Sequence, residues 1–383
     1  MPFLQQSKFK IVSKHSYVRF LIACLIFSIC WAFYTGFRAP NLWSINYYQI
    51  SWLDGFYRRG LLGTLIYPSG CWRFNYYFIE MLQFLVLGFT LGMFICGGYK
   101  NNAIAILIIY FCSAAGGYFF HEVGYVDQLL WIFTFLTIIA LHNKRNLLAS
   151  LLMLASVMMH EMALFIVIPL VWVYVIISRG YSAGNLLKVF TPSLLFFLLL
   201  YLFFQAVPTE TIRQYFERAV SCGYSINRKD FLSIYEYSFE QRARFFYTKE
   251  QIALMLLPMA VLAGILVSAA GKVMPLGIFA RITIYLCCLI PFALGYWGKD
   301  TSRWIFLTFT QIMLVWLIIL TKSKNSNIKS AFSRNVFLIA FVLVALILRF
   351  SYFDGFSRRG LSYDGLISFG NYFIDQVSTL PRR

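Results

Sequence analysis

The chain has 383 residues, of which 60% are hydrophobic, 19% aromatic and only 13% charged. Soluble proteins carry about 25% charged and about 45–50% apolar residues, so this composition excludes a soluble enzyme, a disordered chain and a disulfide-stabilised scaffold. The formal charge of +18 arises from 33 Lys and Arg against 15 Asp and Glu. Because the mean hydropathy is +0.70 over the whole chain, this positive charge indicates orientation in a membrane, and no nucleic-acid partner is expected.

Apolar segments follow one another along almost the whole chain. About 20 apolar residues are needed to cross about 30 Å of hydrocarbon, and somewhat fewer where the bilayer is thin. Eleven such segments are expected, at 17–35, 78–97, 103–120, 128–142, 147–160, 162–178, 188–206, 252–269, 274–296, 304–320 and 336–350. The sequence therefore predicts an all-α, polytopic integral membrane protein whose residues 1–383 form a single transmembrane domain.

The expected orientation follows from the basic residues between these segments. The apolar stretch 147–178 is too long for one helix and short for two, and His160-Glu161 interrupts it. If two short helices meet there and the N-terminus is inside, the inner segments carry fifteen basic residues and no acid. A single helix would place the Lys-rich segment 321–335 outside, against the positive-inside rule. We therefore expect a cytoplasmic N-terminus and a periplasmic C-terminus. The outer segments are then 36–77, 121–127, 207–251, 297–303 and 351–383.

An eight-residue motif occurs twice on the expected outer side. DGFYRRGL at 54–61 recurs as DGFSRRGL at 354–361, with seven of eight positions identical. Each copy has one acid and two arginines, namely Asp54, Arg58 and Arg59 in the first and Asp354, Arg358 and Arg359 in the second. On a helix, the Asp and the first Arg would be i,i+4 neighbours, which leaves the second Arg for the phosphate oxygens of a ligand. The alternative is a turn at the membrane surface, shaped by its glycines, whose arginines contact lipid headgroups.

Three further polar clusters lie at outer helix ends. They contain Glu122 and Asp127, His160 and Glu161, and Asp300 and Arg303. Burial would raise the pKa of a carboxyl such as Glu161 and make it a better base near neutral pH, whereas the alternative for this pair is an exposed periplasmic loop. Residues 300–303 could equally cap the start of a helix.

The remaining outer features allow two interpretations each. Segment 207–250 mixes arginines with aromatic residues, which suits a sugar phosphate but is also typical of an amphipathic helix on a membrane. Cys71 and Cys222 are the two cysteines of the outer segments, and a disulfide between them is an option in an oxidising compartment. The His and Glu spacing does not match a zinc site, and no motif supports a divalent cation, so no cofactor is expected.

An outer face of carboxylates, arginines and aromatic residues suits transfer of a glycosyl unit from a polyprenyl diphosphate. A carboxylate would deprotonate the acceptor hydroxyl as it attacks the anomeric carbon. Arginines would stabilise the negative charge that builds up on the departing diphosphate.

The layout of these residues resembles that of GT-C-type membrane glycosyltransferases, with Asp54 in the first outer loop and Glu122 and Asp127 in the second. This resemblance implies that Asp54 is the base or the donor-binding acid and that Glu122 or Asp127 supports it. Glu161 is a candidate for a second base from its place in the sequence. The acidic loops contain no DxD, so a metal-dependent version of this chemistry is not expected.

The Phe- and Tyr-rich, all-membrane chain is also similar to bacterial O-antigen and capsule polymerases of the Wzy type. This resemblance implies the joining of undecaprenyl-diphosphate-linked repeat units at the periplasmic face during lipopolysaccharide biosynthesis, with a chain-length regulator as a partner in the same membrane. Arginines would then hold the diphosphates. These are Arg58, Arg59, Arg303, Arg358 and Arg359, with His160, Asp300 and Asp354 as further substrate-binding candidates.

Two alternatives stay open. Serotype-modifying glycosyltransferases, which add a sugar from a polyprenyl-phosphate donor, are similar in size. A transporter or flippase is the alternative from another class. Such carriers usually hold ionisable groups near the bilayer midplane in broken helices, whereas here the acids gather at one face.

Overall fold

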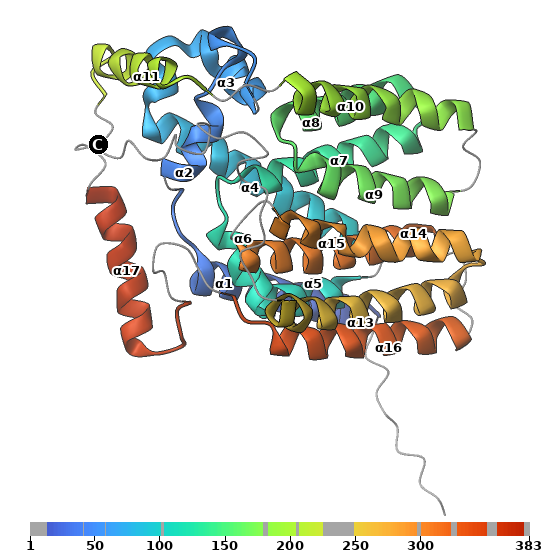
Figure 1. The fold of residues 1–383 in the computed structure, drawn as a ribbon. Coiled ribbons are helices and arrows are strands. Elements are labelled where there is room, and N and C mark those ends of the chain that lie inside the picture. The colour runs from blue at the N-terminus through green and yellow to red at the C-terminus, as the bar shows by residue number, and fades with distance from the viewer. Residues whose placement is uncertain are drawn as a thin grey trace, which may run out of the picture.

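The structure is a computed structural model that describes residues 14–40, 42–57, 59–100, 103–178, 183–203, 207–224, 249–296, 300–322, 328–350 and 358–378. These residues form helices, turns and short irregular segments, and no strand occurs among them (Figure 1). The all-α class expected from the sequence is therefore confirmed.

Helices occupy each of the eleven predicted apolar segments. They are α1 (Lys14–Gly36), α4 (Tyr76–Lys100), α5 with α6 (Ile104–Cys112 and Ala114–His121), α7 (Val126–His142), α8 (Asn146–Met159), α9 (Ala163–Ser178), α10 (Ala183–Phe203), α13 (Lys249–Val273), α14 with η5 (Ile278–Leu289 and Ile290–Tyr296), α15 (Thr301–Lys322) and α16 (Ile328–Ile347). Among the described residues, six helices are long and apolar enough to cross a membrane, and the bent pair α5–α6 adds a seventh. The helices at the other four segments are apolar but shorter. The chain is thus a multi-helix membrane protein, and eleven crossings remain a prediction.

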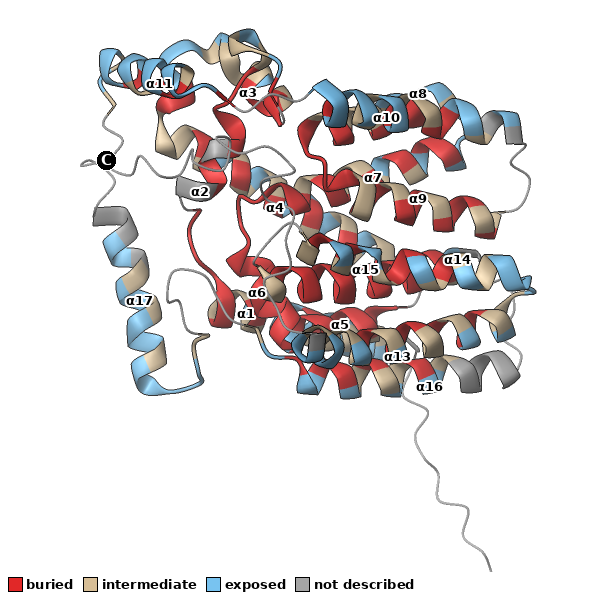
Figure 2. Cartoon of the chain, in the orientation of Figure 1, coloured by how far each residue is buried: buried red, intermediate tan, exposed pale blue. Residues whose placement is uncertain are grey.

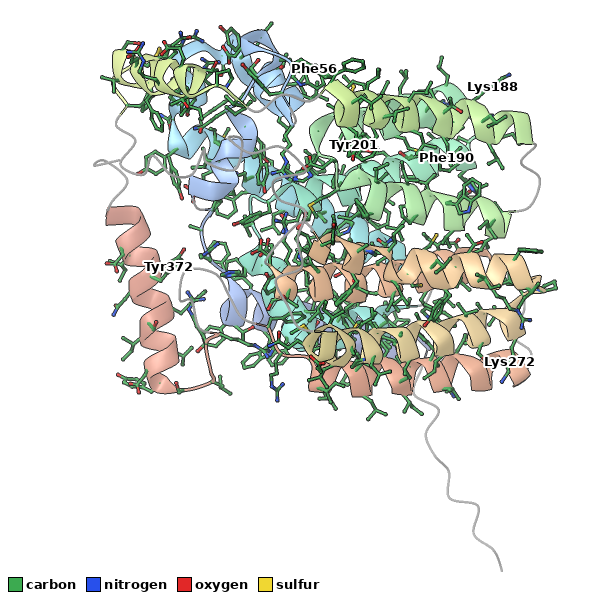
Figure 3. All side chains as sticks on the ribbon, viewed as in Figure 1. Phe56, Lys188, Phe190, Tyr201, Lys272 and Tyr372 are labelled. Carbon is green, nitrogen blue, oxygen red and sulfur yellow. A yellow bond between two sulfur atoms is a disulfide. The ribbon has the colours of Figure 1, made fainter. Side chains whose placement is uncertain are left out.

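Shorter elements gather at one end of the bundle, on the left in Figure 1. After α1 come α2 (Leu42–Ile45), η1 (Asn46–Tyr48), η2 (Trp52–Asp54), α3 (Gly60–Ile66) and η3 (Tyr67–Phe74), after α10 comes α11 (Thr209–Ser221), and the described chain ends with α17 (Tyr363–Ser378). We call this the capped end. Figure 3 shows Lys188 and Lys272 at the opposite end, far from Tyr372 of α17. Lys188 and Lys272, two of the basic residues expected on the inner side, thus lie at the end of the bundle opposite the capped end.

α15 is the central helix of the bundle. Of its most apolar stretch, 89% of the residues are buried, against 22–33% for the other five long helices. Those five present exposed apolar side chains such as Phe27, Phe89 and Leu257 to their surroundings, and Figure 2 shows the buried residues concentrated on the inner helices. An exposed apolar face is what a lipid-facing helix requires, whereas a helix that is apolar all round and enclosed by protein forms a core.

Two breaks in the helices help to position the residues at the capped end. α5 and α6 meet at an angle of 75° at Ser113, whose hydroxyl caps α6 by accepting a hydrogen bond from the Ala115 N–H at 3.1 Å. α1 and α6 then cross so closely that a Cβ on Gly36 would lie 1.8 Å from the Gly117 carbonyl oxygen, so only glycine fits there. This crossing brings the end of α1 to the end of α6.

The second break separates α8 from α9, as the sequence predicts. His160 has an extended backbone, with φ −161° and ψ 132°, and Glu161 and Met162 form the turn before α9 begins at Ala163. Both His160 and Glu161 are buried, so the alternative of an exposed periplasmic loop is wrong.

The side-chain amide of Gln311 in α15 links α9 to the α14–η5 segment, and each of these two contains a proline. Pro169 in α9 has no N–H for the carbonyl of Phe165, four residues earlier, and Pro291 has none for Cys287. Gln311 Nε2 donates to both of these carbonyl oxygens, at 3.2 Å and 3.0 Å. One buried side chain therefore satisfies the two carbonyls that Pro169 and Pro291 leave without a helical donor.

The first outer segment and α11 form a second, smaller core. Its buried residues include Ile50, Tyr57 and Phe74 from the first segment and Ile212 and Tyr215 from α11. A disulfide between Cys71 and Cys222, with a Cα–Cα distance of 5.4 Å, joins the two parts. The apolar face of α11 is thus covered by protein, so its amphipathic pattern does not mark a helix lying on lipid. The arginines of segment 225–248 lie outside the described residues.

Candidate functional site

Arg303 is the centre of a buried group of charges at the capped end. It lies in the first turn of α15 and is 4% exposed. Its Nε donates to Asp127 Oδ2 at 2.8 Å and its Nη2 donates to Oδ1 at 2.9 Å, which is the bidentate geometry of a strong charge-assisted pair. Asp127 stands in the first turn of α7, where the helix dipole also stabilises a negative charge.

Glu122 is a second carboxylate beside the same arginine. It follows α6 directly, is 1% exposed, and its Oε2 lies 3.7 Å from Arg303 Nε. Burial raises the pKa of Glu122 to about 8, an effect that Arg303 opposes and the charge of Asp127 reinforces. Burial also raises the pKa of Asp300, which immediately precedes α15. Glu122 can therefore gain or lose a proton near neutral pH, as a general acid or base must.

Arg59 and Glu161 form a second buried ion pair. Arg59 Nε lies 3.0 Å from both carboxylate oxygens of Glu161, and Nη2 donates to Oε1. The two side chains come from the segment before α3 and from the break between α8 and α9. Each lies next to a helix end, and the backbone of Arg59, with a φ of 62°, is in the left-handed region.

His160 lies beside this pair. Its Nδ1 accepts a hydrogen bond from the Met162 N–H at 3.1 Å and lies 3.4 Å from Glu161 Oε2.

Tyr47 connects the two ion pairs. The Arg59 guanidinium lies 5.3 Å from the centre of its ring, and the His160 and Tyr125 rings lie 5.5 Å and 6.0 Å away. The Tyr125 ring in turn lies 4.7 Å from the Arg303 guanidinium. These contacts make one buried charge cluster. Its members are Tyr47, Arg59, Glu122, Tyr125, Asp127, His160, Glu161 and Arg303.

Arg38 is a neighbour of this cluster that sequence reasoning missed. It is 9% exposed, lies two residues beyond α1, and its positive charge acts on Glu122, Tyr125 and Tyr372. Its position at the end of an apolar segment was the available signal, and it is weak because eighteen basic residues lie on the predicted outer side. Tyr47 and Tyr125 had no comparable signal because aromatic residues are common throughout the chain.

Asp54 lies apart from the buried charge cluster in the described contacts. The prediction that Asp54 and Arg58 face each other on a helix is wrong, because η2 ends at Asp54 and the backbone turns at Gly55, where φ is 144°. Asp54 Oδ1 instead accepts from Arg218 Nη1 of α11 at 3.0 Å. The alternative of a turn therefore describes the first copy of the motif. Arg58 itself lies outside the described residues.

The second copy of the motif serves a different purpose. The Arg359 N–H donates to the Thr35 carbonyl, and its Nη1 donates to the carbonyls of Phe37 at 2.8 Å and Tyr34 at 3.3 Å. A cation that binds the last carbonyls of a helix satisfies them and complements the helix dipole. Both second arginines therefore have protein partners in this structure, since Arg359 caps α1 and Arg59 pairs with Glu161, and their binding of a ligand stays a prediction. Arg358 is partly exposed, and Asp354 lies outside the described residues.

Six of the predicted residues therefore come together, although they are far apart in sequence. Arg59, Glu122, Asp127, His160, Glu161 and Arg303 belong to the buried charge cluster, and Asp300 adjoins it through its charge interaction with Arg303 and Asp127. In the part of the chain that the structure describes, no three His, Cys, Asp or Glu side chains converge as metal ligands do.

Comparisons of this chain with known protein families, with curated proteins and with solved structures find no match. The class of the protein therefore follows from its own fold. It is a polytopic helical membrane protein with a buried charge cluster at one end of its bundle.

Proposed function

We propose that the protein is a glycosyltransferase of a bacterial inner membrane, which acts at the periplasmic face on undecaprenyl-diphosphate-linked sugars and joins them into O-antigen or capsule repeats. One observation carries the proposal. Asp127 and Glu122 both lie beside one buried arginine, Arg303, and burial raises the pKa of Glu122 to about 8. Carboxyl groups with separated roles beside a guanidinium suit acid–base chemistry on a substrate that carries phosphate.

The proposed reaction needs a carboxylate, guanidinium groups and the two substrates. The acceptor hydroxyl gives its proton to a carboxylate while its oxygen bonds to the anomeric carbon of the donor sugar. The bond from that carbon to the phosphate oxygen breaks, and the polyprenyl diphosphate leaves with the electron pair. Guanidinium groups stabilise the charge on this leaving group.

In the absence of substrate, both arginines are occupied by carboxylates. Arg59 is bound by Glu161 and Arg303 by Asp127, so an arriving diphosphate has to displace a carboxylate before it binds an arginine. A carboxylate that loses its guanidinium partner becomes more basic, because the neighbouring positive charge no longer favours its ionised form. Substrate binding would thus prepare the base. Glu161 is the candidate for a base prepared in this way, Glu122 exchanges a proton near neutral pH without it, and Asp54 at the Arg218 contact is left as a binding residue.

The test uses purified protein in liposomes with lipid-linked oligosaccharide as substrate. We expect longer lipid-linked chains from the wild type, and a rate at least about 100-fold lower for Glu122→Gln and Asp127→Asn, in line with the loss of a general base or of the residue that orders it. Glu210→Gln is the matched control, because Glu210 is an exposed carboxylate of α11 at the same end. Full activity of the Glu122, Asp127 and Glu161 variants together would reject the proposal.

The products also separate the alternatives. A ladder of products indicates polymerisation, and addition of one sugar from a polyprenyl-phosphate donor indicates a serotype-modifying transferase. Movement of labelled lipid-linked sugar across the bilayer with no new glycosidic bond would instead identify a transporter. Whether a chain-length regulator binds is tested by a change in the length distribution of the products on adding one.

A further inference from the structure

α17 is held at the level where the first membrane helix ends. The apolar segment of α1 runs from Ser16 to Gly36. Arg359, just before α17, binds the carbonyls of Tyr34 and Phe37, and the Tyr372 hydroxyl accepts a hydrogen bond from the Ala39 N–H. Ring contacts of Phe369 with Tyr34 at 5.3 Å and with Phe33 at 6.1 Å complete the attachment. These bonds fix the depth of α17 at one boundary of the apolar layer.

The direction of α17 differs from that of the bundle. Figure 1 shows it, in red at the left, running across the long axes of α13, α14 and α16. A helix across the bundle axis at this depth lies approximately in the plane of the membrane surface. It cannot cross the apolar layer in this position.

The surface of α17 is divided into three faces, each about a third of its circumference at 100° per residue. The first, with Gly365, Phe369 and Tyr372, packs against α1 and the residues that follow it. The second is polar and consists of Asp364, Ser368, Asn371 and Asp375. The third is apolar and exposed, with Tyr363, Leu366, Ile367 and Ile374, which are 43–78% exposed.

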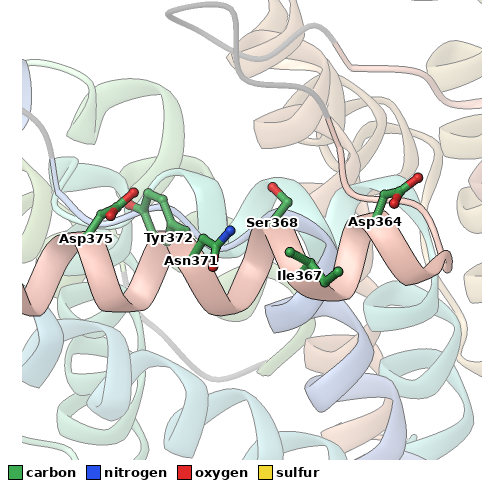
Figure 4. A pocket seen from close by; sticks show the side chains of 6 residues that line it. All are labelled: Asp364, Ile367, Ser368, Asn371, Tyr372 and Asp375. Carbon is green, nitrogen blue, oxygen red and sulfur yellow. The ribbon is translucent and has the colours of Figure 1, made fainter.

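The polar face lines an open hollow of about 470 Å³, shown in Figure 4, with Ile367 and Tyr372 at its borders. The polar and apolar faces therefore meet along Ile367. Among the described residues, no protein covers the apolar face, and a helix with such a face at the boundary of the apolar layer has the form of an interfacial helix.

We infer that the apolar face of α17 is inserted into the lipid bilayer between the headgroups and the acyl chains, while its polar face points to water. The occupant of the apolar face is thus lipid. The lipid-facing surface of α1, with exposed Ile26, Phe27 and Cys30, leads towards the residues of α1 that hold α17, so the bilayer that surrounds α1 reaches α17. Tyr363 on the apolar face is of the residue type enriched at membrane interfaces.

The experiment places one environment-sensitive fluorescent amino acid at position 366 or 371 of the full chain in liposomes. Both positions are on the exposed side of α17, so neither substitution removes a core contact. We expect lipids brominated on their acyl chains to quench the probe at 366 several-fold more than the probe at 371. Iodide in the water should show the reverse order.

Two results would overturn the inference. Equal access of iodide to both positions would mean that the apolar face is in water. Protection of position 366 from both quenchers, lost on dilution of the protein into excess lipid, would mean that a second protein copy covers it. Unchanged thermal unfolding of each labelled protein shows that the fold is intact.

Discussion

Arg303 and Arg213 each pair with two carboxylates, and the difference between them is burial. Arg303 binds Asp127 and Glu122 inside the bundle, whereas Arg213 binds Glu210 and Glu217 on the exposed side of α11. Removal of a buried partner leaves the opposite charges without compensation, which typically costs about 3–5 kcal/mol. Exposed pairs contribute little because water and salt screen them.

We therefore expect Arg303→Met to lower the free energy of unfolding by about 3–5 kcal/mol. Arg213→Met, which removes the same number of ion pairs, should leave the thermal unfolding temperature in detergent unchanged within error. Tryptophan fluorescence during heating measures both. Equal unfolding temperatures for the two variants would show that water reaches Arg303 freely.

Glu122 should make the stability depend on pH. Burial raises its pKa from 4.5 to about 8, and Asp127 and Asp300 reinforce this, while Arg303 and Arg38 oppose it. Between these two values the unfolded chain has lost the proton and the folded chain still holds it. The free energy of unfolding contributed by Glu122 is thus fully present below pH 4.5, decreases as the pH rises and is lost above about 8.

The measurement is thermal unfolding at intervals from pH 5 to 8. Glu122→Gln should flatten the decrease, because the amide does not titrate, whereas Glu210→Gln should leave the decrease as in the wild type. The same slope in Glu122→Gln and wild type would mean that another group is responsible.

Some residues of the buried charge cluster could be selected from the sequence, but their partners could not. Glu161, Asp127 and Arg303 could be selected because ionisable residues at the ends of apolar segments are costly unless they have a function or a partner. Their partners could not be derived, since Arg59 and Glu161 are 102 residues apart and Arg303 and Asp127 are 176 apart. Pairing at such distances depends on how the helices pack, and periodicity carries no information about that.

At the scale of elements, the two DGFxRRGL copies have the same local sequence but different tertiary partners. Arg59 meets a carboxylate from the break between α8 and α9, whereas Arg359 meets the end of α1. In the first copy, the backbone turns at Gly55 and is left-handed at Arg59. The helical pattern predicted for Asp54 and Arg58 failed because an i,i+4 spacing is meaningful only where the backbone is helical.

Gln311 is a residue that the sequence did not single out but that links two elements of the bundle. Its amide satisfies the carbonyls of Phe165 and Cys287 that Pro169 and Pro291 leave without a helical donor. We expect Gln311→Leu, which has a similar volume, to destabilise the protein by about 1–3 kcal/mol for each carbonyl left unsatisfied. Thermal unfolding in detergent measures the loss.

Pro169→Ala is the companion substitution for this prediction. It restores an N–H for the Phe165 carbonyl, so in the Gln311→Leu background it should recover part of the stability. If Gln311→Leu is as stable as the wild type, the two carbonyls are satisfied by other donors.

At the scale of the whole molecule, two independent features indicate the same orientation. Under the predicted topology the fifteen inner basic residues face no acid, and the other eighteen face fifteen acids, so the net charges are +15 and about +3. Basic loops stay on the cytoplasmic side. The disulfide between Cys71 and Cys222 lies at the capped end, and disulfides persist on the oxidising side of a membrane and are reduced in the cytoplasm. Charge and redox chemistry each favour the predicted orientation, with the capped end on the periplasmic side, and this orientation stays a prediction.

This agreement gives a direct test of the orientation. Protein taken from intact cells, with free thiols blocked at lysis, should yield a peptide in which Cys71 is joined to Cys222, and mass spectrometry identifies it. Reporter domains fused after Lys272 and after Gly223 should report cytoplasm and periplasm, respectively. A reduced Cys71 together with a cytoplasmic reporter at Gly223 would invert the bundle. It would also place the buried charge cluster on the cytoplasmic side, where the proposed reaction could not use periplasmic lipid-linked sugars.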